Sequence, residues 1–339
     1  MLIEKATSEN AAPNVLVTGG RGFIGSHLVE SLRQGGLNVV SVDIQEGVLP
    51  KPIGVTQVNS DIRNRAFMNE LFAQYRFQCV FDLASYTIVG LSAKDYQRNV
   101  EKTEAMLDMV TGYKTSKYIF YSTQFVYRTK NSLPKNEEDY APADAYGESK
   151  VKSEKLIRSS LPKDQWLILR PSYIWGPGLE RFRDGLLYRL AKNQLLVPSD
   201  TSIFRYYGYV ETVAAQTCKF YLQDFSSLPS KVYYLSDDAI PVHRFCEYLI
   251  NALGQGRAWR IPPYFIRVLG LAGQLLERFG ISAPINSMQA RELTTNFPIP
   301  IEPTINLTHC VTDYASAAAK TVRWALENPS FARCVRRNQ

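Results

Sequence analysis

The chain has 339 residues, of which 45% are hydrophobic and 21% are charged, a composition typical of a globular protein with about two domains. Its net charge of +7 is spread along the sequence and forms no basic stripe with interleaved aromatic residues, which argues against binding to nucleic acid. The cysteines are scattered without metal-ligand spacing, which predicts no metal site. The start lacks the features of a secretory signal, and the apolar runs are too short to span a bilayer. We therefore predict a cytoplasmic protein with no membrane span.

The first predicted elements form a strand, a glycine turn, a helix and a second strand. An apolar run over 14–18 leads into Gly19-Gly20-Arg21-Gly22-Phe23-Ile24-Gly25, followed by helical periodicity over 26–34 and a second apolar run over 38–42. In the spacing of Gly19, Gly22 and Gly25, the first glycine permits a tight turn, the second lets the backbone approach a pyrophosphate, and the third lets helix and strand pack closely. Asp43, at the end of the second strand, is placed to bind ribose hydroxyls and to repel a 2′-phosphate. The pattern therefore predicts NAD, rather than NADP, as the cofactor.

The pattern then continues through alternating strands and helices. Strands over 55–59, 79–83, 118–122 and 166–170 alternate with helices over 65–75, 94–112 and 146–159, which predicts an α/β Rossmann domain with a doubly wound parallel sheet. Asp61-Ile62 follows the third strand, where Asp61 could contact adenine or could cap the next helix.

After Pro171 the chain is punctuated by proline and glycine, which predicts a smaller C-terminal substrate-binding lobe. We assign residues 13–170 to the NAD-binding domain and residues 171–330 mainly to this lobe, whose segments partly rejoin the first domain. The apolar stretch over 259–280 predicts either a lid or an amphipathic core helix, and we favour the core helix.

Tyr146 and Lys150 carry the predicted chemistry. They lie four residues apart on one face at the start of a helix, and a cation one turn from a phenol stabilises the phenolate. Tyr146 can then exchange a proton with a substrate hydroxyl while hydride passes to or from NAD. Ser122 and Thr123 follow the fifth strand at its carboxyl end, where ligands of open α/β sheets bind. The predicted chemistry is proton exchange at a substrate hydroxyl coupled to hydride transfer.

These motifs, together with residues 80–85, Asn99-Val100 and Arg170-Pro-Ser-Tyr-Ile-Trp-Gly-Pro-Gly178, resemble the extended short-chain dehydrogenase/reductase superfamily. Within it, the chain is similar to the NAD-dependent epimerase/dehydratase family that acts on nucleotide sugars. The resemblance implies that Thr123, Tyr146 and Lys150 form a catalytic triad. It also implies a homodimer in which the helices that start near Lys94 and Tyr146 pack as a four-helix bundle.

The resemblance further implies two sets of binding residues. The cofactor set is Gly19, Gly22, Phe23, Ile24, Gly25, Asp43, Asp61, Ile62, Leu83, Ala84, Ser85, Asn99, Ser122, Tyr146, Lys150 and Pro171. The substrate set is Thr123, Gln124, Tyr173 and Arg205, with Arg205, in the run Arg205-Tyr-Tyr-Gly-Tyr-Val210, on the nucleotide phosphates.

Departures from the family pattern narrow the reaction. Gln124 and Phe125 stand where the 4,6-dehydratases have an Asp-Glu pair, and the ketoreductase/3,5-epimerases have a cysteine at the position of Phe125. Neither additional acid/base set is present, which leaves oxidation and reduction at one carbon. A 4-epimerase and a net oxidoreductase are equally compatible with these residues, and the preference for NAD favours the epimerase. Tyr173 replaces a frequent asparagine that touches substrate phosphates, a departure that counts against a nucleotide-sugar substrate, and Asp82 replaces a common histidine.

Two other functions remain open. A 3β-hydroxysteroid dehydrogenase shares the NAD turn and the Tyr-Lys pair, but the run from 284–287 through 321–324 resembles bacterial nucleotide-sugar epimerases. A non-catalytic NAD-sensing protein would not need Tyr146 and Lys150, so their presence counts against it.

Overall fold

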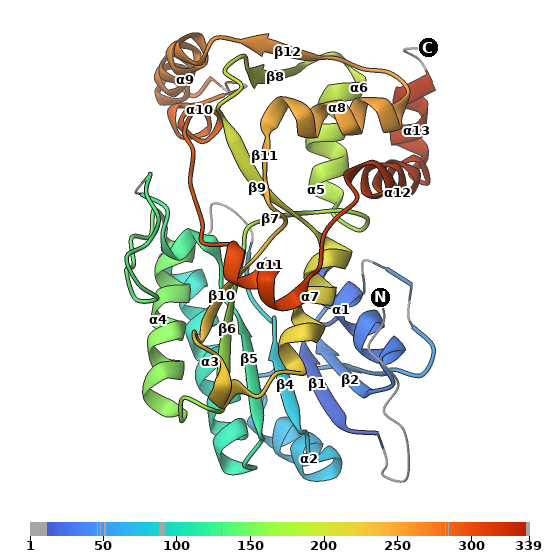
Figure 1. The fold of residues 1–339 in the computed structure, drawn as a ribbon, viewed down its shortest axis with the longest axis vertical. Helices are drawn as coiled ribbons and strands as arrows, with labels where there is room; N and C mark the ends of the chain where they lie inside the picture. Colours follow the sequence, from blue (N-terminus) through green and yellow to red (C-terminus); the bar gives the residue numbers. More distant parts are fainter. Residues whose placement is uncertain are drawn as a thin grey trace. The chain divides into compact units, whose positions relative to one another are not determined.

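The computed structural model describes residues 12–45, 47, 49–50, 52–87, 92–129, 131–281, 283 and 285–336. The chain divides into two compact units (Figure 1). The first comprises residues 1–174, 210–236 and 299–311, and the second comprises residues 175–209, 237–298 and 312–339. The chain therefore leaves the first unit after residue 174 and returns to it twice.

The first unit is built on a seven-stranded sheet of order β10-β6-β5-β4-β1-β2-β3. All neighbouring strands are parallel, which confirms the predicted Rossmann sheet. Chain order reverses beside β1, and the crevice at such a reversal is where open α/β sheets bind ligands. The strands are β1 (Asn14–Thr18), β2 (Asn38–Asp43), β3 (Thr56–Asn59), β4 (Cys79–Asp82), β5 (Lys117–Tyr121), β6 (Trp166–Pro171) and β10 (Val232–Leu235).

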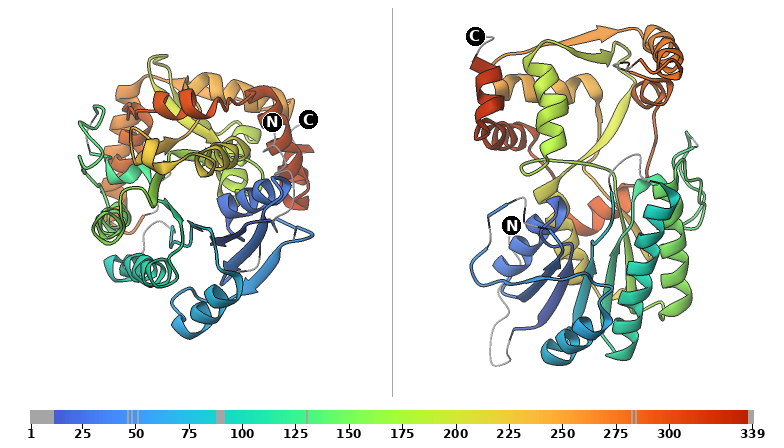
Figure 2. Two further views of the ribbon diagram at one scale, coloured as in Figure 1. Left: turned by 60° about the horizontal axis from the view of Figure 1, so that its bottom comes forward. Right: turned by 180° about the vertical axis from the view of Figure 1, so that it is seen from behind.

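Helices cover both faces of this sheet (Figures 1 and 2). One apolar cluster joins Val15 and Val17 to α1 (Phe23–Gln34) and α7 (Val210–Tyr221). The other joins Leu16 to α2 (Arg65–Tyr75), α3 (Ala93–Gly112) and α4 (Ala145–Ser160). Successive strand residues point to opposite faces, so a strand covered on both sides reads as a continuous apolar run. Shorter elements of this unit are the 3₁₀ turns η1 (Gln124–Val126) and η3 (Phe225–Ser227) and the helix α11 (Glu302–Thr308).

Local capping decides where two of these helices begin. The Asn64 side chain accepts a hydrogen bond from Phe67 N and caps α2, and Ser92 and Asp95 form a capping box at the start of α3. The alternative role of Asp61 as a helix cap is therefore wrong, because Asn64 occupies the capping position.

The second unit contains two small sheets and several helices around Trp175 and Phe245, whose rings meet edge to face at 5.0 Å. Its strands are β8 (Leu195–Pro198), β9 (Phe204–Tyr209), β11 (Ala239–Pro241) and β12 (Ala258–Ile261), and the chain enters the unit along β7 (Tyr173–Trp175). Its helices are α5 (Glu180–Phe182), the π-turn η2 (Arg183–Leu187), α6 (Tyr188–Ala191), α8 (Val242–Leu253), α9 (Pro263–Arg278), α10 (Ser287–Thr294), α12 (Tyr314–Leu326) and α13 (Pro329–Arg336). None of the helices in the described ranges combines the length and apolar content that crossing a bilayer requires.

The prediction that the stretch over 259–280 forms a core helix is wrong. Its helix is α9, in which Ile266, Gly270 and Gly273 are buried while most of the large apolar side chains are exposed. The helical periodicity identified an apolar side correctly, but periodicity does not determine whether another element covers that side.

Candidate active site

The predicted glycine turn follows β1 and lies against the end of β4. Gly19 has a φ of +66°, and a Cβ there would lie 2.9 Å from the backbone of Leu83 and Ala84. A Cβ on Gly25 would overlap the carbonyl oxygen of Gly19, so the start of α1 packs directly on the turn. The sequence thus brings together the predicted cofactor residues Gly19, Gly25, Leu83 and Ala84.

Thr18 holds this junction in place. Its hydroxyl donates to Asp82 Oδ1 at 2.6 Å and accepts from the backbone N–H groups of Leu83 and Ala84 at 3.1 Å each. Asp82 also accepts a 2.6 Å hydrogen bond from the Tyr118 hydroxyl. Burial raises the pKa of the Asp82 carboxyl, and the two hydroxyl donors oppose that rise. Asp82 is therefore a buried acceptor with two donors of its own.

Asn99 fixes the loop that follows β4. Its Oδ1 accepts from Tyr86 N at 2.8 Å, and its Nδ2 donates to Tyr86 O and to Ser149 Oγ, both at 3.3 Å. The loop is thereby tied to α3 and α4. The Ser85 hydroxyl in the same loop is buried and has no hydrogen-bond partner in the described part of the chain, so it is available to a ligand.

One carboxylate, Asp43, ends β2, and another, Asp61, follows β3. Asp43 accepts hydrogen bonds from Arg21 N at 3.0 Å and from Gln45 N at 3.1 Å, which orient it beside the glycine turn. Asp61 is bound by the Arg63 guanidinium at 2.8 Å, and hydrogen bonds from Arg63 lower the pKa of the Asp61 carboxyl. The Ile62 side chain is buried in the apolar core.

These features fit a dinucleotide. Gly22 caps α1 without a side chain, so no side chain competes for the positive end of that helix. The glycine turn, the Asp43 carboxylate and the buried Ser85 hydroxyl are groups of the kind that bind a dinucleotide. Phe23 and Ile24, also predicted at the cofactor, are the first residues of α1. The described residues contain no cluster of His, Cys, Asp or Glu side chains suited to a metal ion.

Thr123 and Tyr146 lie on a loop and a helix that touch each other. Thr123 follows β5 and caps η1 by accepting a hydrogen bond from Phe125 N at 3.2 Å. Tyr146 is in the first turn of α4, and its ring lies 6.4 Å from that of Phe125. A Cβ on Gly147 would lie 2.6 Å from the carbonyl oxygen of Phe125, so only glycine allows this approach. The contact places the loop of Thr123 beside the turn of Tyr146.

The Lys150 side chain reaches the end of β5. Its Nζ donates to Tyr121 O at 2.7 Å and lies 4.5 Å from the centre of the Phe120 ring. Burial lowers the pKa of Lys150 to about 8, an effect that the carboxylates of Asp82 and Glu154 oppose. The lysine is thus held one helical turn from Tyr146, and burial lowers its pKa.

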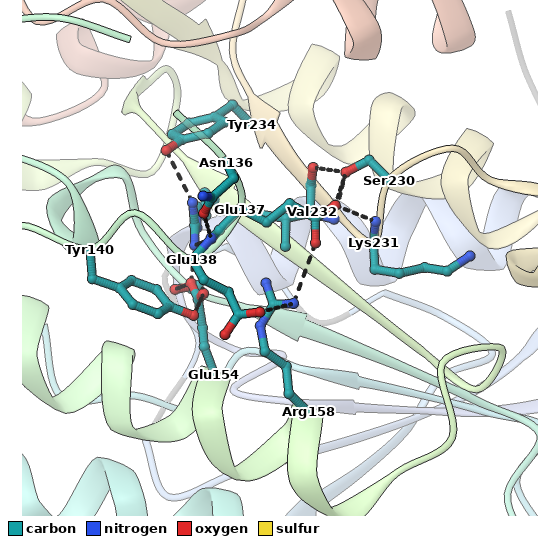
Figure 3. A network of polar contacts seen from close by, with 12 residues as sticks. Asn136, Glu137, Glu138, Tyr140, Glu154, Arg158, Ser230, Lys231, Val232 and Tyr234 are labelled. Carbon is teal, nitrogen blue, oxygen red and sulfur yellow. Dashed lines mark hydrogen bonds and ion pairs between the residues drawn. The ribbon is translucent and has the colours of Figure 1, made fainter. Parts of the chain in front are cut away.

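Glu154 and Arg170 form a buried ion pair that the sequence did not indicate. The two side chains are 0% and 1% exposed and meet at 2.7 Å, and Glu154 also accepts hydrogen bonds from Ser122 Oγ at 2.5 Å and from Tyr140 Oη at 2.9 Å. Figure 3 shows Tyr140 against Glu154. The predicted cofactor residue Ser122 is therefore engaged by Glu154. No spacing in the sequence relates Glu154 on α4 to Arg170 on β6, so the pair had no local signal.

A second carboxylate extends this network to β10. Glu137 accepts hydrogen bonds from Ser230 Oγ at 2.6 Å and Lys231 N at 2.9 Å, and Arg158 Nη1 approaches it at 3.3 Å, as Figure 3 shows. Arg170 Nη2 donates to the Glu137 carbonyl at 2.7 Å. The network joins α4, β6 and β10 behind the loop that carries Thr123.

The predicted substrate residues are distributed over both units. Gln124 is buried, and its Nε2 has no hydrogen-bond partner in the described ranges. The Tyr173 hydroxyl accepts a hydrogen bond from Arg128 Nη2, and the Arg128 guanidinium lies 5.3 Å and 5.2 Å from the centres of the Phe125 and Tyr173 rings. The sequence analysis missed Arg128, although an arginine at the end of the Ser122–Tyr127 loop was a usable signal. Pro171 is buried at the end of β6.

Arg205 lies in the second unit, on β9. Its Nη1 donates to Phe204 O at 2.6 Å, its side chain packs 5.9 Å from the Phe297 ring, and its Nη2 is buried without a hydrogen-bond partner among the residues that the structure describes. A guanidinium nitrogen in that state is suited to an anionic ligand.

Residues 15–234 match the model of the NAD dependent epimerase/dehydratase family. The chain belongs to this family. It is therefore an NAD-dependent enzyme of the type that the glycine turn and the Tyr-Lys pair predicted, which confirms the resemblance and the cofactor.

Curated relatives match part of the chain. The UDP-glucose 4-epimerase of Halalkalibacterium halodurans is 33% identical over 149 residues, which cover 42% of this chain and 45% of the relative. The UDP-glucose 4-epimerase of Azospirillum brasilense is 29% identical over 160 residues, covering 44% and 45%. A probable UDP-arabinose 4-epimerase of Arabidopsis thaliana is 30% identical over 168 residues, covering 44% and 40%. The match thus spans a little less than half the length of these relatives.

Solved structures share the fold over nearly the whole chain. The UDP-glucose 4-epimerase of Thermotoga maritima, determined with UDP-glucose, has a TM-score of 0.71 at 20% identity and covers 93% of this chain and 99% of its own. The Bordetella bronchiseptica enzyme WbmH, in complex with NAD⁺, has a TM-score of 0.71 at 17% identity and covers 94% and 99%. At these identities the likeness concerns the fold.

Proposed function

We propose that the protein is a nucleotide-sugar epimerase that inverts the configuration at C4. The observation that carries the proposal is the loop after β5, where Thr123 is followed by Gln124 and Phe125 and packs on the turn that holds Tyr146. In that loop the Ser122 hydroxyl is engaged by Glu154 and the Tyr127 hydroxyl by Ser132, which leaves the Thr123 hydroxyl beside the Tyr146 phenol, and the loop carries no carboxylate, thiol, histidine or lysine. The matched relatives named as 4-epimerases support the same reaction.

The chain's own residues would handle the proton of the C4 hydroxyl. Tyr146 removes the proton, Thr123 donates a hydrogen bond to the same oxygen, and the charge of Lys150 stabilises the phenolate. When bound, NAD supplies the acceptor and donor of hydride. After the keto sugar turns over, Tyr146 returns the proton to the same oxygen, so the net reaction consumes no reductant.

Substrate-binding residues are proposed for each unit by itself. Gln124 and the Arg128–Tyr173 pair would contact the sugar or its diphosphate, and Arg205 would bind the nucleotide phosphates. A homodimer through α3 and α4 and a cytoplasmic location are also proposed. Light scattering after size exclusion and cell fractionation test these two points.

The deciding experiment incubates the purified protein with UDP-, GDP- and dTDP-sugars and follows the products by NMR. Conversion to the C4 epimer without accumulation of NADH supports the proposal, and Tyr146→Phe should abolish it while NAD stays bound. Steady formation of NADH would instead identify a net oxidoreductase. If the protein neither binds nor converts any sugar of the panel, that result contradicts a nucleotide-sugar enzyme. A sterol would then be the next substrate to test.

A further inference from the structure

Helix α9 packs on its neighbour through its smallest residues. α9 and α10 lie side by side in the second unit (Figure 1). A Cβ on Gly270 would overlap Ala290 Cβ and one on Gly273 would overlap the Ile285 carbonyl oxygen, so both positions require glycine. With Ile266, these glycines are the buried residues of α9. The contact therefore covers a narrow strip of the helix and none of its largest side chains.

The opposite side of α9 is a broad apolar stripe that faces solvent. At 100° per residue, Tyr264, Val268, Leu271 and Leu275 fall on one line along the helix, and a parallel line begins at Phe265. Together the two lines span about 160° of the circumference. The large apolar side chains in the stripe are between 41% and 64% exposed. A stripe of this width normally faces a core, and an exposed one marks an interaction surface.

Arginines outnumber acidic residues around the stripe, where Arg260 is paired with Glu247 at 2.8 Å and Glu292 follows Arg291 on α10. Residues 254–291 contain five arginines and a single acidic residue, Glu277. Arg267, Glu277 and Arg278 lie on α9 outside the stripe, whereas Arg257 and Arg260 precede the helix. Aromatic side chains stand at both ends of the stripe, with Trp259, Tyr264 and Phe265 before or at its start and Phe279 after its end, each at least 44% exposed.

We propose that α9 docks the protein onto an anionic lipid surface. An amphipathic helix with a basic margin and exposed aromatic residues lies in the plane of the bilayer interface, with its apolar face among the acyl chains and its arginines near the anionic headgroups. A second copy of this chain fits the surface less well, because two such faces would bring ten arginines together against six glutamates, two each of Glu247, Glu277 and Glu292. The proposal depends on α9 and its margins and is independent of the reaction proposed above.

The test is flotation of the full-length protein with vesicles of phosphatidylcholine alone and with about 30% phosphatidylglycerol added, at low and high salt. We expect the wild-type protein to float with the anionic vesicles, and more strongly at low salt. The double substitution Leu271→Gln/Leu275→Gln should lower the partition coefficient about tenfold or more, since each leucine would lose its burial in lipid. Ile53→Gln, at an apolar residue of the first unit that is 92% exposed, is the matched control and should float like the wild type.

A second measurement does not depend on the stripe variant. Trp259 fluorescence, isolated as the signal lost in Trp259→Phe, should shift to shorter wavelength when anionic vesicles are added. Absence of flotation and of this shift overturns the proposal, as does a stripe variant that floats like the wild type. A dimer that forms without lipid and is lost in Leu271→Gln/Leu275→Gln, with no flotation, would also overturn it and assign the stripe to a second copy.

Discussion

Replacing Arg170 by methionine should destabilise the protein strongly. Arg170 makes two hydrogen bonds to the Glu154 carboxylate, at 3.0 Å and 2.7 Å, one to Tyr234 Oη at 3.2 Å and one to the Glu137 carbonyl at 2.7 Å. Both members of the ion pair are inaccessible to solvent, so Arg170→Met leaves a buried carboxylate without its counter-charge. Such a change costs about 3–5 kcal/mol of unfolding free energy, which urea denaturation monitored by circular dichroism would measure.

The double variant Arg170→Met/Glu154→Gln separates the charge from the packing. The glutamine keeps one oxygen, which can accept from either Ser122 or Tyr140, and its amide nitrogen can donate to the other hydroxyl. Because it carries no charge, it should recover about 2 kcal/mol relative to Arg170→Met alone. Arg244→Met is the matched control, because its pair with Glu247 is 67% and 40% exposed and should contribute less than about 1 kcal/mol. An Arg170→Met protein within about 1 kcal/mol of the wild type, or a double variant no more stable than the single one, would refute the reasoning.

Three further predictions concern the site. The folded-state pKa of Lys150, about 8, lies below its ordinary value of 10.5, so the folded protein releases the lysine proton at a lower pH than the unfolded chain does. The free energy of unfolding should therefore rise from pH 8 to pH 10.5, and this gain is lost as the pH falls through 8. Lys150→Met should remove that slope in urea melts across this range. Gly147→Ala should push the Phe125 carbonyl away and lower kcat at least about tenfold, whereas Gly112→Ala, where nothing lies near the added methyl, should leave kcat unchanged. Asp43→Ala should weaken NAD binding by about 1–2 kcal/mol, read by calorimetry, and equal affinity would remove Asp43 from the ribose site.

The Rossmann sheet was predictable because its strands are covered on both faces. Residues such as Leu16 and Val17 are both buried but against different helices, so each central strand is apolar throughout and stands out from the amphipathic helices. The return of residues 210–236 and 299–311 to the first unit was harder to locate. Those segments depend on contacts such as the Thr304 hydroxyl on Tyr234 O, which join distant parts of the chain and have no local pattern.

Residues of the candidate site were predictable where the chemistry requires a fixed spacing along the chain. Residues whose role depends on contact with a distant segment were not predictable. Gly19, Gly25, Tyr146 and Lys150 stand at fixed intervals, so they can be recognised without a structure. The pairing of Glu154 with Arg170 depends on α4 lying against β6, which no spacing reports. The exposure of α9 was missed for the same reason.

The two residues that depart from the family pattern, Asp82 and Tyr173, both accept side-chain hydrogen bonds in this chain. Asp82, in place of a histidine, accepts hydrogen bonds from Thr18 and Tyr118, and Tyr173, in place of an asparagine, accepts one from Arg128. An asparagine at 173 would offer a neutral amide donor, whereas the Tyr173–Arg128 pair offers a cation held between two rings. Such a cation suits a phosphate at least as well as an amide does. The tyrosine at position 173 is therefore compatible with a nucleotide-sugar substrate. A neutral sterol has no anionic group that could pair with the buried guanidinium of Arg128.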